Sequence, residues 1–181
     1  MDTMERDIER VLISQIELEK AVQEIGAKIS ADYAGEEPVF VGVLKGSFIF
    51  MADLMRHVTV NCNMDFMAVS SYSGTTPTGA VKINKDLNED IEGKHVIIVE
   101  DILDSGVTLN YLKGYLEGRN PASIKICTLM DKPARRKAPV YADYSCFEVP
   151  DAFVVGYGLD YNERYRNLPY IGVLKPEVYG G

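Results

Sequence analysis

Apolar residues recur along this chain with two different spacings, which together predict helices alternating with buried strands. From Leu18 to Tyr33 they return every three or four positions, which is typical of an amphipathic helix, and Gly35 marks its end. Short, continuous apolar runs predict buried strands instead, and helical spacing returns between those runs. The expected strands are 39–44, 95–99, 123–130, 153–155 and 171–174, the further helices are 47–55 and 107–116, and residues 58–68 are expected to be extended with a bend.

Strands that alternate with helices imply an α/β fold with a mostly parallel sheet covered on both faces. The chain has 181 residues, which suits one domain over residues 1–181. In such a sheet, ligands bind beyond the carboxyl ends of the strands. Three of these ends carry unusual polar residues, and we expect them at the same edge: Lys45-Gly46, Glu100–Thr108 and Asp131-Lys132.

One segment, Ser70–Gly93, differs from the rest. It contains Gly74, Pro77 and Gly79 and many charged residues, and only 80–83 resembles a strand. A segment of this kind within a compact domain is usually functional or mobile.

The overall charge limits which partners this chain can have. Its formal net charge is −8, so it should repel a nucleic-acid backbone, and we expect no nucleic-acid partner. Any phosphate-bearing ligand must therefore be held by local groups, such as backbone amides, a few placed cations or a metal ion.

Cysteines, histidines and the N-terminus exclude several other classes. The odd count of three widely spaced cysteines is neither a disulfide framework nor a zinc motif, and the two histidines lie far apart. The first ten residues are acidic where a signal peptide would be basic and then apolar. No apolar run reaches the length of a membrane span, so we expect a cytoplasmic protein without membrane contact.

The most informative stretch reads VIIVEDILDSGVTL, from Val96 to Leu109. A buried strand leads into the paired carboxylates Glu100 and Asp101, then Asp104, then a Ser-Gly turn that begins a helix. Free backbone N–H groups at a helix N-terminus make an anion site. The simpler alternative is that Asp104 or Ser105 only caps the helix. That alternative does not explain the adjacent carboxylates, which suit the hydroxyls of a sugar or a metal ion.

This stretch resembles the signature of type I phosphoribosyltransferases, and its EDILDSG form is similar to the hypoxanthine–guanine branch. Further segments follow the order found in that family: Leu44-Lys45-Gly46, Ser71-Tyr72, Asp131-Lys132-Pro133 and VPDAFVVGYGLDYNERYRNLPYIGVL. The resemblance implies a doubly wound α/β core with a small hood built from N- and C-terminal segments. It implies Mg²⁺-dependent transfer of the phosphoribosyl group from phosphoribosyl pyrophosphate to hypoxanthine or guanine, giving IMP or GMP. We also expect a homo-oligomer, either a dimer or a tetramer.

For the ribose phosphate, the resemblance implies that Glu100 and Asp101 accept from the ribose hydroxyls, directly or through metal and water. Backbone amides of Ser105, Gly106, Val107 and Thr108 would bind the 5′-phosphate. Asp104 would face N7 of the base and act as general base.

For the purine and pyrophosphate, the resemblance implies that Lys132 donates to the 6-oxo group, Phe153 stacks on the ring and the Val154 backbone reads its edge. The remaining implied residues are Asp160 for Mg²⁺, Arg166 and the Lys45-Gly46 peptide for pyrophosphate, and Ser71-Tyr72 at the start of a lid. The family often holds that peptide in the cis form. Each of these roles has a simpler alternative. Lys132 would be an exposed lysine, Phe153 a core residue, Asp160 and Arg166 a surface salt bridge, and the predicted lid a flexible hairpin.

Three rival functions remain open. The first is a xanthine- or adenine-preferring relative, although an ammonium donor at Lys132 argues against adenine. The second is a nucleotide-sensing RNA-binding regulator, for which the only basic patch is DKPARRK, ending at Lys137. The third is a nucleotide-binding module without turnover.

Overall fold

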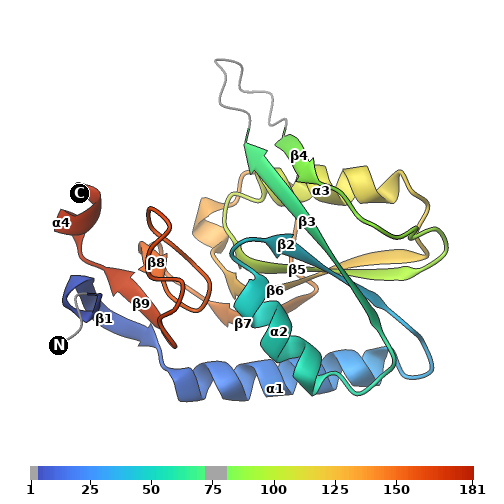
Figure 1. Ribbon diagram of the computed structural model, residues 1–181, viewed down its shortest axis with the longest axis horizontal. Coiled ribbons are helices and arrows are strands. Elements are labelled where there is room, and N and C mark those ends of the chain that lie inside the picture. Colours follow the sequence, from blue (N-terminus) through green and yellow to red (C-terminus); the bar gives the residue numbers. More distant parts are fainter. Residues whose placement is uncertain (1–3, 72–80) are drawn as a thin grey trace.

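The computed structural model describes residues 4–71 and 81–181, and its main feature is a six-stranded sheet in the order β4-β3-β2-β5-β6-β7 (Figure 1). All neighbouring strands are parallel except the edge strand β4, which runs antiparallel to β3. The mostly parallel α/β sheet that the sequence predicts is therefore confirmed. The strands are β2 Val39–Leu44, β3 Asn63–Ser71, β4 Val81–Lys85, β5 His95–Leu103, β6 Ser123–Asp131 and β7 Tyr144–Glu148.

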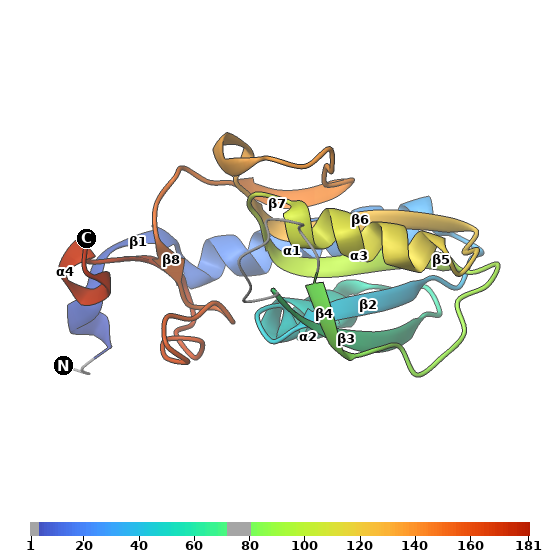
Figure 2. The ribbon, with the colours of Figure 1, turned by 90° about the horizontal axis from the view of Figure 1, so that it is seen from above.

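Helices cover both faces of this sheet (Figure 2). Helices α1 (Gln15–Asp32) and α2 (Phe48–His57) pack on one face through a cluster that includes Phe40 and Ile97. Helix α3 (Val107–Glu117) packs on the other face, against Val41 and Ile98. Adjacent strand residues thus belong to different cores because side chains alternate between the two faces of a strand, and this explains why the strands read as continuous apolar runs.

A second, smaller sheet forms the predicted hood beside the main sheet (Figure 1). It joins β1 (Ile8–Ile13), β9 (Ile171–Leu174) and β8 (Val154–Val155) in antiparallel order, and the short helix α4 (Pro176–Tyr179) follows β9. The N- and C-terminal segments therefore lie together, as expected. Two short 3₁₀ turns, η1 (Glu5–Asp7) and η2 (Pro133–Arg135), complete the described elements.

The predicted strands of the main sheet need three corrections: β3 ends at Ser71 and not at residue 68, β7 was not predicted, and β5 is longer than expected. Strands β2, β5 and β6 are parallel neighbours, so their carboxyl ends meet at one edge. The sequence placed the end of β5 at Val99, but the strand continues to Leu103 because Ile102 and Leu103 pair with Met130 and Asp131 of β6. Glu100 and Asp101 therefore belong to a strand and not to a loop.

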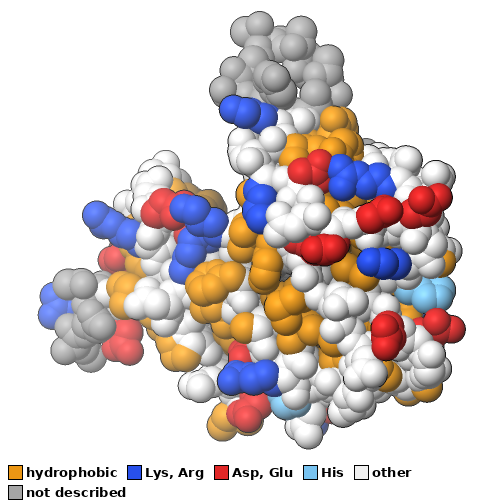
Figure 3. Space-filling model, turned by 45° about the vertical axis from the view of Figure 1, so that its right-hand side comes forward, with side chains coloured by type: hydrophobic (Ala, Val, Ile, Leu, Met, Phe, Trp, Pro, Cys, Tyr) orange, Lys and Arg blue, Asp and Glu red, His pale blue; other side chains and the backbone are white. Residues whose placement is uncertain are grey.

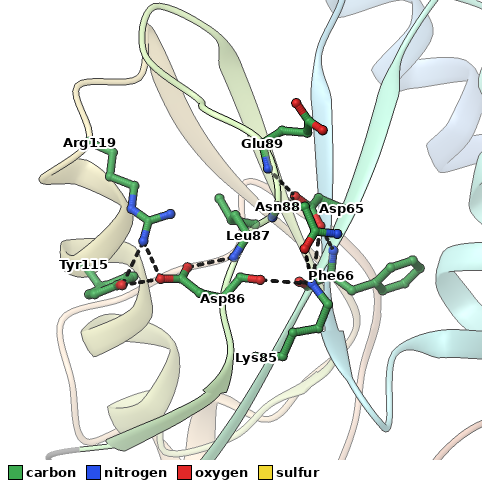
Figure 4. A network of polar contacts seen from close by, with 9 residues as sticks. All are labelled: Asp65, Phe66, Lys85, Asp86, Leu87, Asn88, Glu89, Tyr115 and Arg119. Atoms are coloured by element: carbon green, nitrogen blue, oxygen red, sulfur yellow. Dashed lines mark hydrogen bonds and ion pairs between the residues drawn. The ribbon is translucent and has the colours of Figure 1, made fainter.

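The structure describes only part of the predicted lid, Ser70–Gly93. Tyr72 and residues 73–80 lie outside the described residues. The segment after β4 is fixed by two carboxylates (Figure 4). Asp65 of β3 is buried and accepts hydrogen bonds from the backbone N–H groups of Asn88 and Glu89, at 2.8 and 3.2 Å. Asp86 accepts from Tyr115 Oη and Arg119 Nη2 of the α3 region, each at 2.5 Å. Residues 86–89 are therefore tied to the sheet and to α3.

No helix in the described part of the chain is long and apolar enough to cross a membrane.

Candidate active site

A pocket of about 530 Å³ lies at the carboxyl edge of the main sheet, between that sheet and the hood. The end of β5 and the segments that follow β5 and β6 supply one wall, while β8, its flanking loops and α4 supply the other. Six predicted site residues line it: Asp101, Asp104, Lys132, Phe153, Val154 and Asp160. Six further residues line it that the sequence did not single out: Ile102, Arg135, Asp151, Ala152, Leu159 and Tyr179.

The carboxylate pair Glu100–Asp101 is packed against the turn that follows β2. A Cβ atom built on Gly46 would lie only 1.9 Å from Oδ2 of Asp101, so this position requires glycine. Gly46 thereby brings the Lys45-Gly46 turn into contact with the β5 carboxylates, as the shared sheet edge predicts.

Burial makes this carboxylate pair unfavourable in its charged form. It raises the pKa of Glu100 well above the usual value, and the negative charge of Asp101 adds to the effect. Burial also raises the pKa of Asp101. Within residues 4–71 and 81–181 no Lys or Arg forms an ion pair with either carboxylate, so a cation from outside the chain would relieve the pair.

The turn after β5 has the geometry of an anion site. Gly106 is the N-cap of α3, with φ of 75°, and as a glycine it has no side chain that could cap the helix. A Cβ at Gly106 would lie 2.5 Å from Val140 Cγ1, so glycine is required on steric grounds as well. In the described part of the chain Ser105 Oγ accepts from Val107 N at 3.4 Å, a long hydrogen bond, and no other side chain accepts from a first-turn amide, so these amides are available to a ligand.

Asp104 is therefore not the helix cap, which removes the simpler explanation for that residue. Its side chain is exposed and borders the pocket, while its backbone carbonyl accepts from Arg136 Nε at 3.1 Å. Arg136 also donates to the Val140 carbonyl at 2.7 Å and pairs with Asp131. This arginine holds the Asp104 turn in place from behind, a role that the sequence did not predict.

Lys132 is buried and directs its ammonium into the pocket wall. Its Nζ donates to the carbonyl of Ala152 at 2.9 Å. Burial lowers the pKa of Lys132, while Asp151 and Asp104 oppose that shift. An ammonium has three N–H donors, and only one of them is used by the described residues. The alternative of an exposed lysine is wrong here.

Phe153 lies at the pocket surface and not in the core, so the core alternative is also wrong. It is 38% exposed and stacks on Tyr179, with ring centroids 4.6 Å apart and planes at 17°. Tyr161 contacts the same ring edge to face at 5.5 Å.

Asp160 and Arg166 form the ion pair that we named as the alternative, with 3.3 Å between Arg166 Nη2 and Asp160 Oδ1. Their loop packs on the turn after β2, because a Cβ at Gly158 would lie 2.3 Å from the Gly46 carbonyl oxygen. Arg166 Nη1 donates to the Gly158 carbonyl at 2.7 Å, while its Nε is buried without a partner among the described residues. Arg166 Nη2 also pairs with Glu163 at 3.1 Å, and Glu163 in turn accepts from Lys45 Nζ at 2.9 Å, so these side chains link the loop to the turn after β2.

The cis peptide of this turn is one residue earlier than the position that the resemblance implies. It joins Leu44 to Lys45, and not Lys45 to Gly46. Ser71 ends β3 with an exposed side chain and does not line the pocket.

The predicted metal ligands, Glu100, Asp101 and Asp160, do not form a group of three that could hold a metal ion by itself. In the described ranges no group of three or more His, Cys, Asp or Glu side chains could hold a metal ion. Asp101 and Asp160 nonetheless line the same pocket.

Comparison with known proteins decides the family. A model described as the phosphoribosyl transferase domain matches residues 12–162, which is most of the chain. The chain belongs to the phosphoribosyltransferase family.

Relatives of this phosphoribosyltransferase include the hypoxanthine-guanine phosphoribosyltransferases of Bacillus subtilis and Streptococcus pneumoniae. The chain is 58% and 53% identical to them over 177 residues, covering 97% of this chain and 98% of each relative. A crystal structure of a hypoxanthine phosphoribosyltransferase from Staphylococcus aureus is 50% identical, with a TM-score of 0.96 over 99% of this chain and 98% of that one. The phosphoribosyltransferase fold expected from the sequence is confirmed.

The partly buried carboxylate pair of this phosphoribosyltransferase predicts a gain in stability for Glu100→Gln. A raised folded-state pKa means that the folded protein binds more protons than the unfolded chain, so stability falls as the pH rises from the ordinary carboxyl pKa through the raised one. Glutamine does not ionise, so the substitution removes the free-energy cost of holding a charged carboxylate at this position in the folded protein. We expect a higher Tm at neutral pH, by about 2–4 °C for each 1 kcal/mol of penalty removed, and no gain below about pH 4.

Thermal unfolding of the ligand-free protein across this pH range measures the effect. Glu37→Gln, at an exposed position, is the matched control and should show no pH-dependent gain. A difference for Glu100→Gln that does not vary with pH would contradict the penalty.

Proposed function

We propose that this chain is a purine salvage enzyme that transfers the phosphoribosyl group from phosphoribosyl pyrophosphate to hypoxanthine or guanine, giving IMP or GMP. The observation that carries this proposal is the composition of one pocket. A donor-only cation (Lys132), an aromatic face (Phe153) and a free carboxylate (Asp104) border it together, next to an open helix N-terminus. These groups match a 6-oxopurine, its N7 proton and a ribose phosphate.

The chemistry follows from that placement. The 5′-phosphate binds at the amides of residues 105–108, which places the anomeric carbon near Asp101 and Asp104. Purine N9 forms a bond to this carbon as the bond to pyrophosphate breaks, and Asp104 takes the N7 proton. The negative charge of Asp104 also stabilises positive charge that develops on the ribose in the transition state.

A divalent cation, which we propose to be Mg²⁺, fits the remaining groups. Mg²⁺ is commonly bound by one or two carboxylates together with substrate phosphates and water, so a group of three protein ligands is not required. Glu100 and Asp101 on one side, and Asp160 on the other, are the carboxylates that would hold it. When bound, the ion would neutralise the pyrophosphate charge as that group leaves.

The experiment that tests the function is a panel of bases with phosphoribosyl pyrophosphate. We expect nucleotide formation with hypoxanthine and guanine, and little or none with adenine or uracil. An arm without divalent cation should give no nucleotide until Mg²⁺ is restored. Turnover of adenine alone, or of no base, would overturn the proposal. Xanthine is included in the panel because contacts at position 2 of the purine distinguish a xanthine-preferring enzyme from one that uses hypoxanthine or guanine.

The RNA-binding rival loses much of its support, because three of the four cations in its basic patch are engaged within the protein and only Lys137 is left exposed and without an ion pair among the described residues. Arg135 pairs with Asp151 at 2.8 Å, Arg136 pairs with Asp131, and Lys132 is buried in the pocket. On the face drawn in Figure 3, basic and acidic side chains are interspersed among the described residues. A filter-binding assay with structured RNA should therefore show no specific retention.

The proposal extends to the organisation of the chain. One hydrophobic cluster joins hood residues Ile13 and Val173 to Phe40 and Ile97 of the main sheet, which supports a single domain over residues 1–181. We further propose that the enzyme is a cytoplasmic homo-oligomer.

A further inference from the structure

Tyr179, on the C-terminal helix α4, contributes a side chain to the pocket that no predicted role explains. It borders the same pocket as Lys132 and Asp104. Its ring lies almost parallel to that of Phe153, at 17° and with 4.6 Å between centroids. Such a pair is in direct stacked contact.

This contact covers one face of Phe153, the residue on which the proposed base would stack. A planar base between two rings requires two successive contacts of about 3.5 Å each, or about 7 Å between the ring planes. The observed separation of 4.6 Å leaves no such space. One face of Phe153 can therefore hold either Tyr179 or a base.

We propose that Tyr179 occupies the face of Phe153 on which the purine stacks, and that the purine displaces it on binding. The inference rests on the proposed base site. It makes Tyr179 a residue that sets the affinity for the base and for the product nucleotide. Tyr179 does not affect the affinity for phosphoribosyl pyrophosphate, because that substrate binds at the Gly106 turn and the carboxylates.

Val178 and Tyr179 of α4 pack as partly buried side chains on the hood cluster of Val155, Tyr165, Leu168 and Leu174, so displacement of Tyr179 gives up a limited contact. The helix has four residues, and none of them is fully buried. Among the described residues, Lys175, which precedes the helix, donates one backbone hydrogen bond to Asp7 O of the N-terminal segment, at 2.9 Å. Short segments near a chain end move at low cost. Tyr161, which meets Phe153 at 87°, keeps that ring in position when Tyr179 leaves.

The first test is Tyr179→Ala. A stacked aromatic pair contributes a factor of roughly 2 to 10 in an equilibrium constant. The variant should therefore lower KM for hypoxanthine and Kd for IMP by roughly 2- to 10-fold, with KM for phosphoribosyl pyrophosphate unchanged. Tyr179→Phe retains the stacked ring and should restore the wild-type values. Unchanged or weaker IMP binding by Tyr179→Ala would overturn the inference, since weaker binding would mean that Tyr179 supports the base.

The second test uses the absence of tryptophan from the sequence. Tyr179→Trp introduces a single tryptophan stacked on Phe153, and IMP with Mg²⁺ should shift its emission to longer wavelength as the ring moves into water. Tyr111→Trp is the matched control, because Tyr111 is 40% exposed on α3 and does not line the pocket. Its emission should not respond.

The two proposals fail differently. If the wild-type protein forms no nucleotide from any base, the proposed function is wrong. If it forms IMP normally and the Tyr179→Trp emission does not respond to IMP, the displacement of Tyr179 alone is wrong.

Discussion

We expect Asp104→Asn to slow the chemical step by roughly 10²–10⁴-fold while leaving the fold and the binding of the ribose phosphate almost unchanged. Asn has the same size as Asp and still accepts a hydrogen bond, but it takes no proton at neutral pH and carries no negative charge. The N-cap of α3 is Gly106, and in the described part of the chain the only side chain that accepts from a first-turn amide is that of Ser105, so a loss of capping by Asp104 cannot produce the effect. The described residues also form no side-chain hydrogen bond to Asp104 that the substitution would break.

A single-turnover measurement by rapid quench is required, because release of product can hide the chemical step in steady-state assays. Asp151→Asn is the matched control. Asp151 is also an exposed acid that lines the pocket, but it is paired with Arg135. Its loss should change the rate far less. A rate for Asp104→Asn within a few-fold of wild type would exclude Asp104 as the base, and Asp101, which lines the same pocket, would be tested next.

The parts of this protein that the sequence predicts well are those with a local physical signature. Strands β2, β5 and β6 are buried on both faces, so each reads as a short apolar run, and the parallel order then places Gly46, Asp101 and Lys132 at one edge. The glycine at position 106 is required by its own backbone angle, which a Ser-Gly turn before a helix already indicates.

The parts that the sequence does not predict depend on contacts between distant residues. Strand β1 is mostly exposed and carries charges, and it is a strand because it pairs with β9, some 160 positions later in the chain. The extension of β5 to Leu103 depends on β6 in the same way. No local pattern indicates these pairings.

The site shows the same division. Arg136 reads as part of a basic run, yet its guanidinium is committed to Asp131 and two backbone carbonyls. Tyr179 reads as an ordinary residue near the end of the chain, and only the fold of the hood brings it to Phe153. The ion pair between Asp160 and Arg166 was foreseen as an alternative, and their roles toward metal and pyrophosphate stay predictions.

The second large effect is expected for Lys132→Met, which keeps a similar length but removes every donor. Losing a charged donor from a buried site costs roughly 1.5–3 kcal/mol, which corresponds to about a 10- to 150-fold loss in kcat/KM for hypoxanthine. KM for phosphoribosyl pyrophosphate should hold, because Lys132 lies with Ala152 and Phe153 on the base side of the pocket. The preference for hypoxanthine over adenine should also shrink, since the ammonium no longer selects a carbonyl over an amino group.

Steady-state kinetics with each substrate varied in turn separates the effect on hypoxanthine from the effect on phosphoribosyl pyrophosphate. Thermal unfolding measures any stability lost because the Ala152 carbonyl has no donor in the variant. Lys137→Met is the matched control, because Lys137 is exposed in the segment that follows η2 and does not line the pocket. It should leave both KM values unchanged. If instead Lys132→Met weakened binding of phosphoribosyl pyrophosphate and left KM for hypoxanthine intact, Lys132 would belong to the ribose phosphate half of the site, and the recognition of the 6-oxo group would have to come from backbone N–H groups near Val154.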